Sequence, residues 1–384
     1  MTDLMSSDIH FVRASVLEEQ RPPTRLSGPL LWMRENLFSS WLNSLLTLVF
    51  VSGVAWVLPD LIHFTLVIPV WVAGSSKDCS AELLGHPVGA CWGFVNAHFG
   101  YFLYGQYPDS ERWRVDIYYG LEAFGIFWIL YPKAPFKGAG LAFFFLVFPI
   151  VGFTLLSGMP SIGLRTVQTH FWGGFLVTIV ISTVGIVASL PIGILLALGR
   201  RSAMPIARLV SVIMIEFVRG VPLITVLFMA NVMFPLFVPD GWRPDSLLRV
   251  LVGVGLFSAA YMAEAVRGGL QAIPRGQYEA AQALGLGYWQ MMIKIILPQA
   301  LKIVIPNIVN NFIGLFKDTT LVAIVGIFDF LRTIQASLAD PNWRSSTMPL
   351  AAYIFAALVY FIFCYGMASY SLAMERRLQT GNRH

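Results

Sequence analysis

The chain has 384 residues, of which 57% are hydrophobic and only 12% are charged. Soluble globular domains carry about 25% charged residues, so this composition excludes a soluble globule. The net charge of +5 does not indicate nucleic-acid binding, because Lys and Arg in so apolar a chain are typical of the cytoplasmic flanks of membrane spans.

Several apolar runs are long enough to cross a hydrocarbon core, which takes about 20 residues in a helix. The runs are continuous rather than alternating, and this favours helices over the strands of a barrel. The sequence therefore predicts an all-α polytopic membrane protein with about eight transmembrane helices.

The first part of the chain predicts a tail and one span. Residues 1–36 are polar and contain Pro22-Pro23, so we expect a cytoplasmic N-terminal tail. The first span covers residues 37–58 and is closed by Pro59-Asp60. Residues 61–74 are apolar but short, and we expect an interfacial or re-entrant piece, with a tight membrane-crossing hairpin as the alternative.

An accessory three-helix region is expected over residues 37–170, with further spans at 115–131 and 138–157 and an insertion at about 59–114. Residues 75–114 hold one Lys together with Cys79 and Cys91, and positive-inside counting places them outside the membrane. In an oxidising compartment a Cys79–Cys91 disulfide would stabilise this loop by about 3 kcal/mol; two free thiols are the alternative. His98 is expected to be structural, and no metal-ligand spacing occurs in the sequence.

Beyond residue 171 the chain predicts five more spans and a polar segment. The spans are expected at 172–199, 209–238, 247–266, 301–331 and 348–374. Arg200-Arg201 and Arg376-Arg377 mark cytoplasmic ends, so that eight spans leave both termini in the cytoplasm.

The segment 273–298, IPRGQYEAAQALGLGYWQMMIKIILP, lies between two of these spans. It is too polar and too rich in glycine to cross a bilayer. A helical period starts at Tyr278, and Gly285 and Gly287 interrupt it. The pattern predicts two short helices joined by a glycine turn at the membrane surface. The small side chains of Ala280, Ala281 and Ala283 would allow close approach of another protein's backbone.

Glu279-Ala280-Ala281, Gly285, Ile295 and Leu297-Pro298 have the spacing of a known motif. The segment resembles the EAA loop of type I ABC-transporter permease subunits, in which this loop is the coupling helix that docks on a separate ATPase subunit. An ordinary interfacial helix pair is the structural alternative. The resemblance implies that residues 171–384 form the permease core with its last five spans.

Three further segments resemble the polar-amino-acid branch of that family: FVRGVP at 217–222, AEAVRGGLQAIPRGQYEAA at 263–281 and KDTTL at 317–321. The long first part is similar to the M-type permease of general L-amino-acid importers. The resemblance implies a permease subunit of an ATP-driven importer in a bacterial inner membrane, which translocates L-amino acids delivered by a periplasmic binding protein.

The implied partners are an ATPase subunit dimer, a homologous second permease subunit, the periplasmic amino-acid-binding protein and membrane lipid, with no nucleic acid. The sequence contains no Gly-x-x-x-x-Gly-Lys phosphate loop and no nucleophile-elbow, metal or paired-carboxylate signature. We therefore expect a non-catalytic chain without a cofactor of its own, with ATP and Mg bound by the partner ATPase.

Charged residues inside spans call for partners or a water-filled path. Glu216 and Arg219 are three residues apart on a helix and are expected to pair. Pro222 predicts a kink, which either borders the translocation path or serves packing alone.

A second polar group, at Lys317, Asp318 and Thr319, interrupts the span 301–331. Asp318 is a good N-cap, and we expect a half-helix after it that either holds a substrate carboxylate or fixes two half-helices together. Glu264 and Arg267 are expected to brace the coupling loop.

Two other classes of protein compete with this interpretation. A secondary transporter or channel for small polar solutes would fit the spans and the buried charges, but it leaves the surface loop motif unexplained. A membrane-embedded enzyme would need a convergent set of catalytic groups, and the sequence shows none.

Overall fold

The computed structural model describes residues 28–131, 133–239 and 244–380. The chain consists of two compact units, one ending at Val67 and one beginning at Ile68. The described residues form helices joined by short turns, with only isolated β-bridges, which confirms the predicted all-α class. Most of the predicted tail, residues 1–27, lies outside the described residues.

The first unit contains α1 (Pro29–Asn36), α2 (Trp41–Ile62) and the π-helical turn η2 (His63–Val67). The Ser40 hydroxyl caps α2 by accepting a bond of 3.2 Å from the backbone N–H of Asn43. Trp41–Val67 form a helix of 27 residues that is apolar enough to cross a membrane. The predicted end at Pro59 is wrong. A proline removes a single amide donor, and the apolar residues on both sides of it continue the helix.

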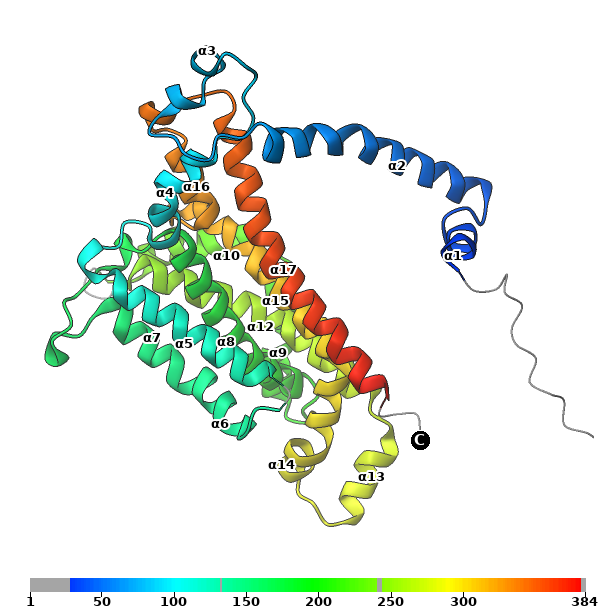
Figure 1. Cartoon of the computed structure of the whole chain (residues 1–384). Coiled ribbons are helices and arrows are strands. Elements are labelled where there is room, and N and C mark those ends of the chain that lie inside the picture. Colours follow the sequence, from blue (N-terminus) through cyan, green and yellow to red (C-terminus); the bar gives the residue numbers. More distant parts are fainter. Residues whose placement is uncertain (1–27, 132, 240–243, 381–384) are drawn as a thin grey trace, which may run out of the picture. The chain divides into compact units, whose positions relative to one another are not determined.

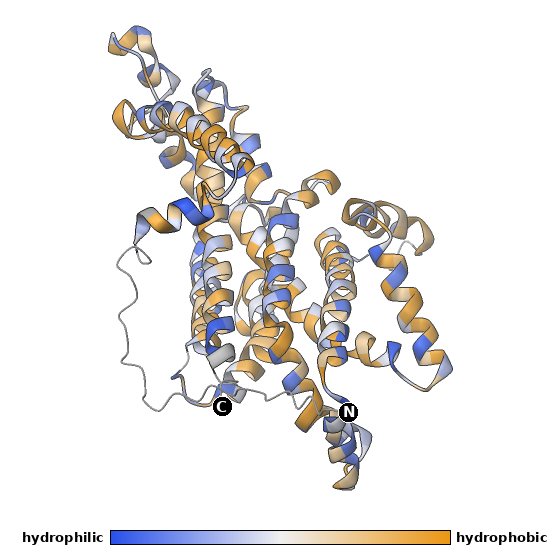
Figure 2. Cartoon of the chain, turned by 90° about the vertical axis from the view of Figure 1, so that its right-hand side faces the viewer, coloured by the Kyte–Doolittle hydropathy of each residue, from blue (hydrophilic) through white to orange (hydrophobic). Residues whose placement is uncertain are grey.

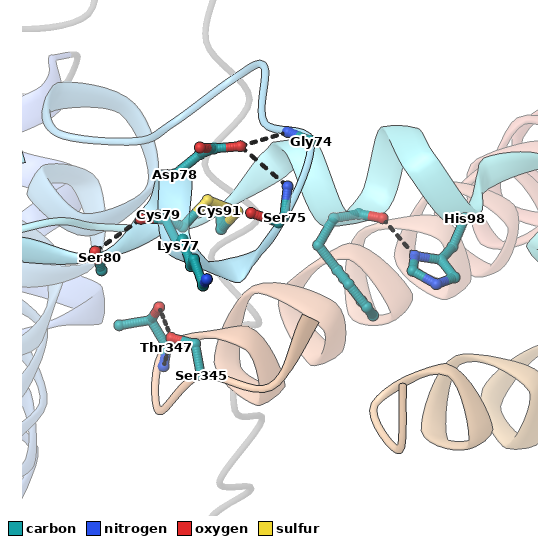
Figure 3. The surroundings of a disulfide bond; sticks show 11 residues. Gly74, Ser75, Lys77, Asp78, Cys79, Ser80, Cys91, His98, Ser345 and Thr347 are labelled. Atoms are coloured by element: carbon teal, nitrogen blue, oxygen red, sulfur yellow. Dashed lines mark hydrogen bonds between the residues drawn. A yellow bond between two sulfur atoms is a disulfide. The ribbon is translucent and has the colours of Figure 1, made fainter. Parts of the chain in front are cut away.

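The second unit begins with the cysteine-containing insertion, which comprises η3 (Ser76–Cys79), α3 (Ala81–Leu84) and α4 (Trp92–Tyr104). A disulfide joins Cys79 to Cys91. Figure 3 shows the Asp78 carboxylate beside it, accepting the backbone N–H groups of Gly74 and Ser75 at 2.8 and 3.0 Å.

The insertion is attached to the C-terminal part of the chain through an apolar cluster. Cys79, Cys91 and Phe94 pack in one buried cluster with Phe330 and Trp343. Phe330 begins α16 (Phe330–Ser337), and Trp343 ends η12 (Pro341–Trp343). The insertion is therefore part of the folded second unit and not a separate module.

The accessory helices follow η4 (Asp109–Glu111) and are α5 (Arg112–Leu130), α6 (Lys137–Ala142), η5 (Phe143–Val147) and α7 (Phe148–Ser157). The stretch from α6 to α7 has the length and composition of a span. Glu122 on α5 is buried and accepts a hydrogen bond from the Thr183 hydroxyl on α8 (Gly174–Arg200). This contact links the accessory helices to helix α8 of the core.

The remaining elements of the second unit belong to the core region. In chain order they are η6 (Pro160–Ile162), η7 (Thr169–Phe171), α9 (Pro205–Arg219), α10 (Leu223–Phe228), η8 (Met229–Met233), α11 (Phe234–Phe237), α12 (Ser246–Ala272), α13 (Arg275–Ala283), α14 (Tyr288–Met291), η10 (Met292–Ile296), α15 (Leu297–Asp318), η11 (Thr319–Val325) and α17 (Met348–Thr380). Hydrophobic residues cover most of the length of the long helices (Figure 2).

Helix α12 packs against both α8 and α15, and α15 packs against α17. Glycines allow two of these close approaches. A Cβ at Gly193 would lie 2.7 Å from the Cβ of Met262, and a Cβ at Gly269 would lie 2.5 Å from the backbone oxygen of Ala300. The helices α8, α12 and α15 therefore form a tightly interlocked centre.

Six helices among the described residues are long and apolar enough to cross a membrane, or seven when the bent pair α9 and α10–α11 is taken as one span. The predicted number of eight included α5, which is helical but rich in charged residues. The bend between Pro205–Arg219 and Leu223–Phe237 is 107°. It falls where the sequence places Pro222, which the structure uses as the N-cap of α10.

Two predictions about helix boundaries are wrong. The second short coupling helix is not separate, because α14 continues through η10 into α15, so that Tyr288–Val325 form one helical stretch of 38 residues. Pro298 lies at the junction of η10 and α15, inside this stretch. Asp318 does not start a half-helix either: it is the last residue of α15, and its side chain caps nothing before η11.

Candidate functional site

Helix α13 lies at one end of the second unit, together with α14, and the disulfide-bearing insertion and α16 lie at the opposite end (Figure 1). The helix ends at Ala283, and Gly285, two residues further on, adopts a left-handed φ of 70°. The backbone N–H of Gly285 donates to Gln282 at 2.9 Å, and that of Leu286 donates to Ala281 at 3.2 Å. This pair of bonds is a Schellman cap, and it explains why the motif needs glycine at this position.

The two faces of α13 differ in exposure. Ala281 is 1% exposed and packs in the same cluster as Ile296 and Ala300. Its small side chain therefore serves packing within the chain, which corrects the prediction that Ala281 faces a partner. Most of the rest of α13 is exposed, including Glu279, Ala280 and Ala283 together with the adjoining Leu284, which is 76% exposed. We call these four residues the outer face of α13.

A contact around Tyr278 attaches α13 to the ends of two core helices. Arg201, just after α8, donates from Nη1 to the backbone oxygen of Leu270 at 3.0 Å and to the Tyr278 hydroxyl at 3.2 Å. The Tyr278 hydroxyl donates to the same Leu270 oxygen at 3.2 Å. The Arg201 guanidinium also lies 5.7 Å from the centre of the Tyr278 ring, a cation–π distance. We call Arg201, Tyr278 and Leu270 the tyrosine clamp.

Glu264 forms the centre of a charge network beside this clamp. Its Oε1 lies 2.8 Å from Nη1 of Arg200, and its Oε2 lies 2.8 Å from Nη2 of Arg267 and 3.7 Å from Nη1 of Arg219. Arg200 also pairs with Glu216 at 2.8 Å. The network joins the adjoining ends of α8, α9 and α12, and Glu264 is the most buried member, with 16% of its side chain exposed.

The predicted pairing of Glu216 with Arg219 is replaced by contacts between helices. Glu216 binds Arg200, and Arg219 binds Glu264. The charged side chains near the end of α9 therefore reach α8 and α12 rather than each other. Glu264 and Arg267 do pair with each other, but the direct attachment of α13 comes from Arg201 and Tyr278.

The other motif residues lie at the start of the following helix. Ile295 and Leu297 are half-buried against the cluster that holds Ala281, and Pro298 is exposed. Sequence reasoning missed the roles of Arg200, Arg201 and Tyr278. The arginine pair was visible as a cytoplasmic flank, but its partners lie 64 and 77 residues further along the chain.

The polar group at the end of α15 is held by its own backbone. Thr319 is 1% exposed, and its hydroxyl donates to the backbone oxygen of Phe316 at 2.8 Å. The Thr320 hydroxyl donates to Lys317 at 3.0 Å. Since Asp318 ends a helix rather than beginning one, no half-helix N-terminus is available here for a substrate carboxylate.

A comparison with known families decides the class of this protein. The family of binding-protein-dependent transport system inner membrane components matches residues 189–380. The chain belongs to this family. The match begins within α8 and includes the whole of the site around α13, so the tyrosine clamp and the Glu264 network lie in the part that this inner-membrane component shares with its family.

Individual relatives extend the similarity to the accessory region. The chain is 48% identical over 355 residues to the inner membrane amino-acid ABC transporter permease protein YhdY of Escherichia coli strain K12. The aligned residues cover 92% of this chain and 94% of YhdY. The chain is 40% identical to the glutamate/glutamine/aspartate/asparagine transport system permease protein BztC of Rhodobacter capsulatus, over 98% of this chain and 100% of that one.

A solved structure is also similar to about half of the chain. The crystal structure of an amino acid ABC transporter with histidines covers 53% of this chain and 92% of its own, with 27% sequence identity and a TM-score of 0.47.

Proposed function

We propose that this chain is the membrane-spanning permease subunit of an ATP-driven importer that translocates L-amino acids. The similarity to two amino-acid permeases over more than nine tenths of the chain supports the substrate class. The observation that carries the mechanism is the outer face of α13, which projects at one end of the unit and is attached to the core at its base.

The outer face has the chemistry of a docking surface. Ala280 and Ala283 let a partner backbone approach closely, and Leu284 is a large apolar side chain left 76% exposed. Together the three side chains form an exposed apolar patch, and such a patch supports a protein interface. We infer that the partner is an ATPase subunit dimer, which binds ATP and Mg and moves α13 during its cycle.

The tyrosine clamp would pass that movement to the membrane helices. Arg201 continues α8, Leu270 lies near the end of α12, and Tyr278 belongs to α13, so that a displacement of α13 acts on two interlocked helices at once. The Glu264 network extends the same contact to α9. Such a device can switch access only if the partner binds differently in the two states, and an ATP-dependent dimer would provide this difference.

The remaining parts of the assembly follow from the same proposal. A homologous second permease subunit completes the translocation path, and a periplasmic binding protein delivers the amino acid. The end that carries α13 faces the cytoplasm of a bacterial inner membrane, and the disulfide-bearing insertion lies on the other side. With α5 as an additional crossing beside the seven candidate spans, eight crossings place both termini in the cytoplasm. The Lys and Arg residues that flank the spans support this orientation.

Site-specific crosslinking tests the docking proposal. A photoreactive amino acid at Leu284, in the transporter assembled with its partner subunits, should crosslink to the ATPase chain. The matched control is Leu83 on α3, which is 68% exposed at the opposite end of the unit and should give no such product. Equal ATPase crosslinking from both positions, or none from Leu284, would contradict the proposal. Transport that persists without ATP and collapses with an ion gradient would select a secondary transporter instead.

A further inference from the structure

An apolar cavity of about 160 Å³ lies between the accessory helices and the core. Its walls come from α5, α7, α8 and α12 and include Tyr118, Phe148, Val180, Val184 and Leu251. Apolar walls offer no hydrogen-bond partners, so a polar group that enters such a space loses its hydration without compensation. This cavity is therefore suited to a hydrocarbon group rather than to a polar substrate.

The cavity is open towards the side of the helix bundle. Phe153 on α7 and Leu248 on α12 belong to its lining, and they are 59% and 50% exposed on the surface of the chain. Apolar side chains that are exposed on spanning helices face the surrounding lipid. The molecules that can enter the opening most directly are therefore the surrounding lipids.

One end of the cavity is polar. Asp245 belongs to the lining and caps α12 by accepting the N–H of Leu247 at 2.9 Å. Its other oxygen accepts the Thr169 hydroxyl at 2.6 Å. A charged residue at the first turn of a spanning helix marks the level of the membrane interface, so the apolar part of the cavity extends from that level into the bilayer.

At the same level, Trp172 supplies a donor without an acceptor. This residue lines the cavity and is only 4% exposed, and its indole Nε1 is buried without a hydrogen-bond partner among the described residues. Buried indole N–H groups usually find an acceptor, because leaving such a donor unpaired is costly. The ester carbonyl of a phospholipid lies at the interface level and is an acceptor of the right kind. Because the Nε1 atom is buried in the structure, the indole must turn towards the cavity to donate to such a carbonyl.

The depth of the cavity fits one leaflet of the membrane. Val184 is ten residues beyond Gly174, the first residue of α8, which corresponds to about 15 Å at the helical rise of about 1.5 Å per residue. The hydrocarbon core is about 30 Å thick. We propose that the cavity holds an acyl chain of a membrane phospholipid whose ester carbonyl accepts the Trp172 N–H. The bound lipid fills the joint between the accessory helices and the core.

Photolabelling of the assembled transporter tests this site. The complex is placed in phospholipid nanodiscs that contain a trace of phosphatidylcholine with a diazirine in its acyl chain, and labelled peptides are measured by mass spectrometry after irradiation. We expect labelling of α12 around Leu251 to exceed that around Leu195, a residue of α8 that is 61% exposed outside the cavity lining. Labelling at Leu251 no higher than at Leu195 would overturn the proposal.

Three variants make the test specific. Val184→Phe fills the cavity and should lower labelling around Leu251 about tenfold, since an overfilled apolar site does not accept further atoms. Leu195→Phe is the matched control on the same helix and should leave it unchanged. Trp172→Phe keeps an aromatic side chain but removes the donor, and should lower labelling about threefold to tenfold.

Unchanged labelling in both cavity variants would overturn the proposal. If Val184→Phe fails to assemble, as judged by size-exclusion chromatography, Leu251→Phe takes its place, with labelling read around Val180 on the facing helix.

Discussion

At the scale of single residues, the site around α13 depends on a few positions with defined geometry. Gly285 provides the left-handed φ of 70° that ends the helix, and Ala281 provides a side chain small enough for the buried face. Glu264 provides the anion shared by three arginines. Each of these roles predicts the effect of a substitution.

Gly285→Ala should lower coupled transport, because an L-residue in the left-handed conformation costs about 1–2 kcal/mol. A Cβ at Gly285 would meet nothing within 4 Å, so conformation and not space decides the outcome. Gly285→Asn should therefore retain more activity than Gly285→Ala, since Asn tolerates this conformation.

The control for this substitution is Gly287→Ala, because Gly287 has an ordinary φ of −67° and equally free surroundings. Transport per ATP hydrolysed in proteoliposomes measures the effect. Equal losses from Gly285→Ala and Gly287→Ala would refute the conformational explanation.

Glu264→Gln should destabilise the complex by about 2–3 kcal/mol, since it leaves partly buried cations without their shared anion. Glu216→Gln is the matched control in the same network: its side chain is 54% exposed, and exposed ion pairs contribute at most about 1 kcal/mol. Thermal unfolding of the purified complex measures both. A larger loss from Glu216→Gln than from Glu264→Gln would show that Glu264 is not the centre of the network.

At the scale of elements, the tyrosine clamp makes α13 an extension of α8 and α12. The contact combines hydrogen bonds among Arg201, Tyr278 and Leu270 with the guanidinium over the ring. Gln299 on α15 adds a bond of 3.2 Å to Gln277 on α13. Helix α13 is thus held by residues that precede the segment 273–298 and by a residue that follows it.

Tyr278→Phe should reduce transport per ATP about threefold to tenfold while docking of the ATPase persists. The variant loses the hydroxyl's hydrogen bonds with Arg201 and Leu270, which stabilise the tyrosine clamp by about 1 kcal/mol. Combining it with Arg201→Ala should give less than the sum of the two single effects, as expected for residues in contact. Additive effects in this double-mutant cycle would mean that the two residues act independently.

The disulfide predicts a local effect at the other end of the unit. Replacing Cys79 and Cys91 together by Ser should increase protease sensitivity and hydrogen exchange in residues 75–90, since a loop of this length loses about 3 kcal/mol of cross-link stabilisation. Exchange in α12 should stay unchanged. Exchange that rises equally in α12 would show that the insertion supports the whole unit rather than its own loop.

At the scale of the whole molecule, much of the fold could be predicted from apolar runs and flanking charges, because helices long enough to span are local features. The coupling segment was recognisable from residue types and spacing. The contacts around it were not, since Arg200 meets Glu264 and Glu122 meets Thr183 across more than sixty residues. Such partners depend on how helices pack. Asp318 was misjudged because cap preference alone does not distinguish the end of a helix from its beginning.

The backbone contact between Gly269 and Ala300 has a mechanical consequence. These residues stand just before and just after the segment 273–298, so they close it at a narrow neck where two backbones touch without an intervening side chain. A force on the far end of this segment therefore cannot be dissipated by separation of α12 and α15, the two helices that connect to it. The force is transmitted to both helices together, and a larger residue at position 269 would push the two backbones apart and weaken this transmission.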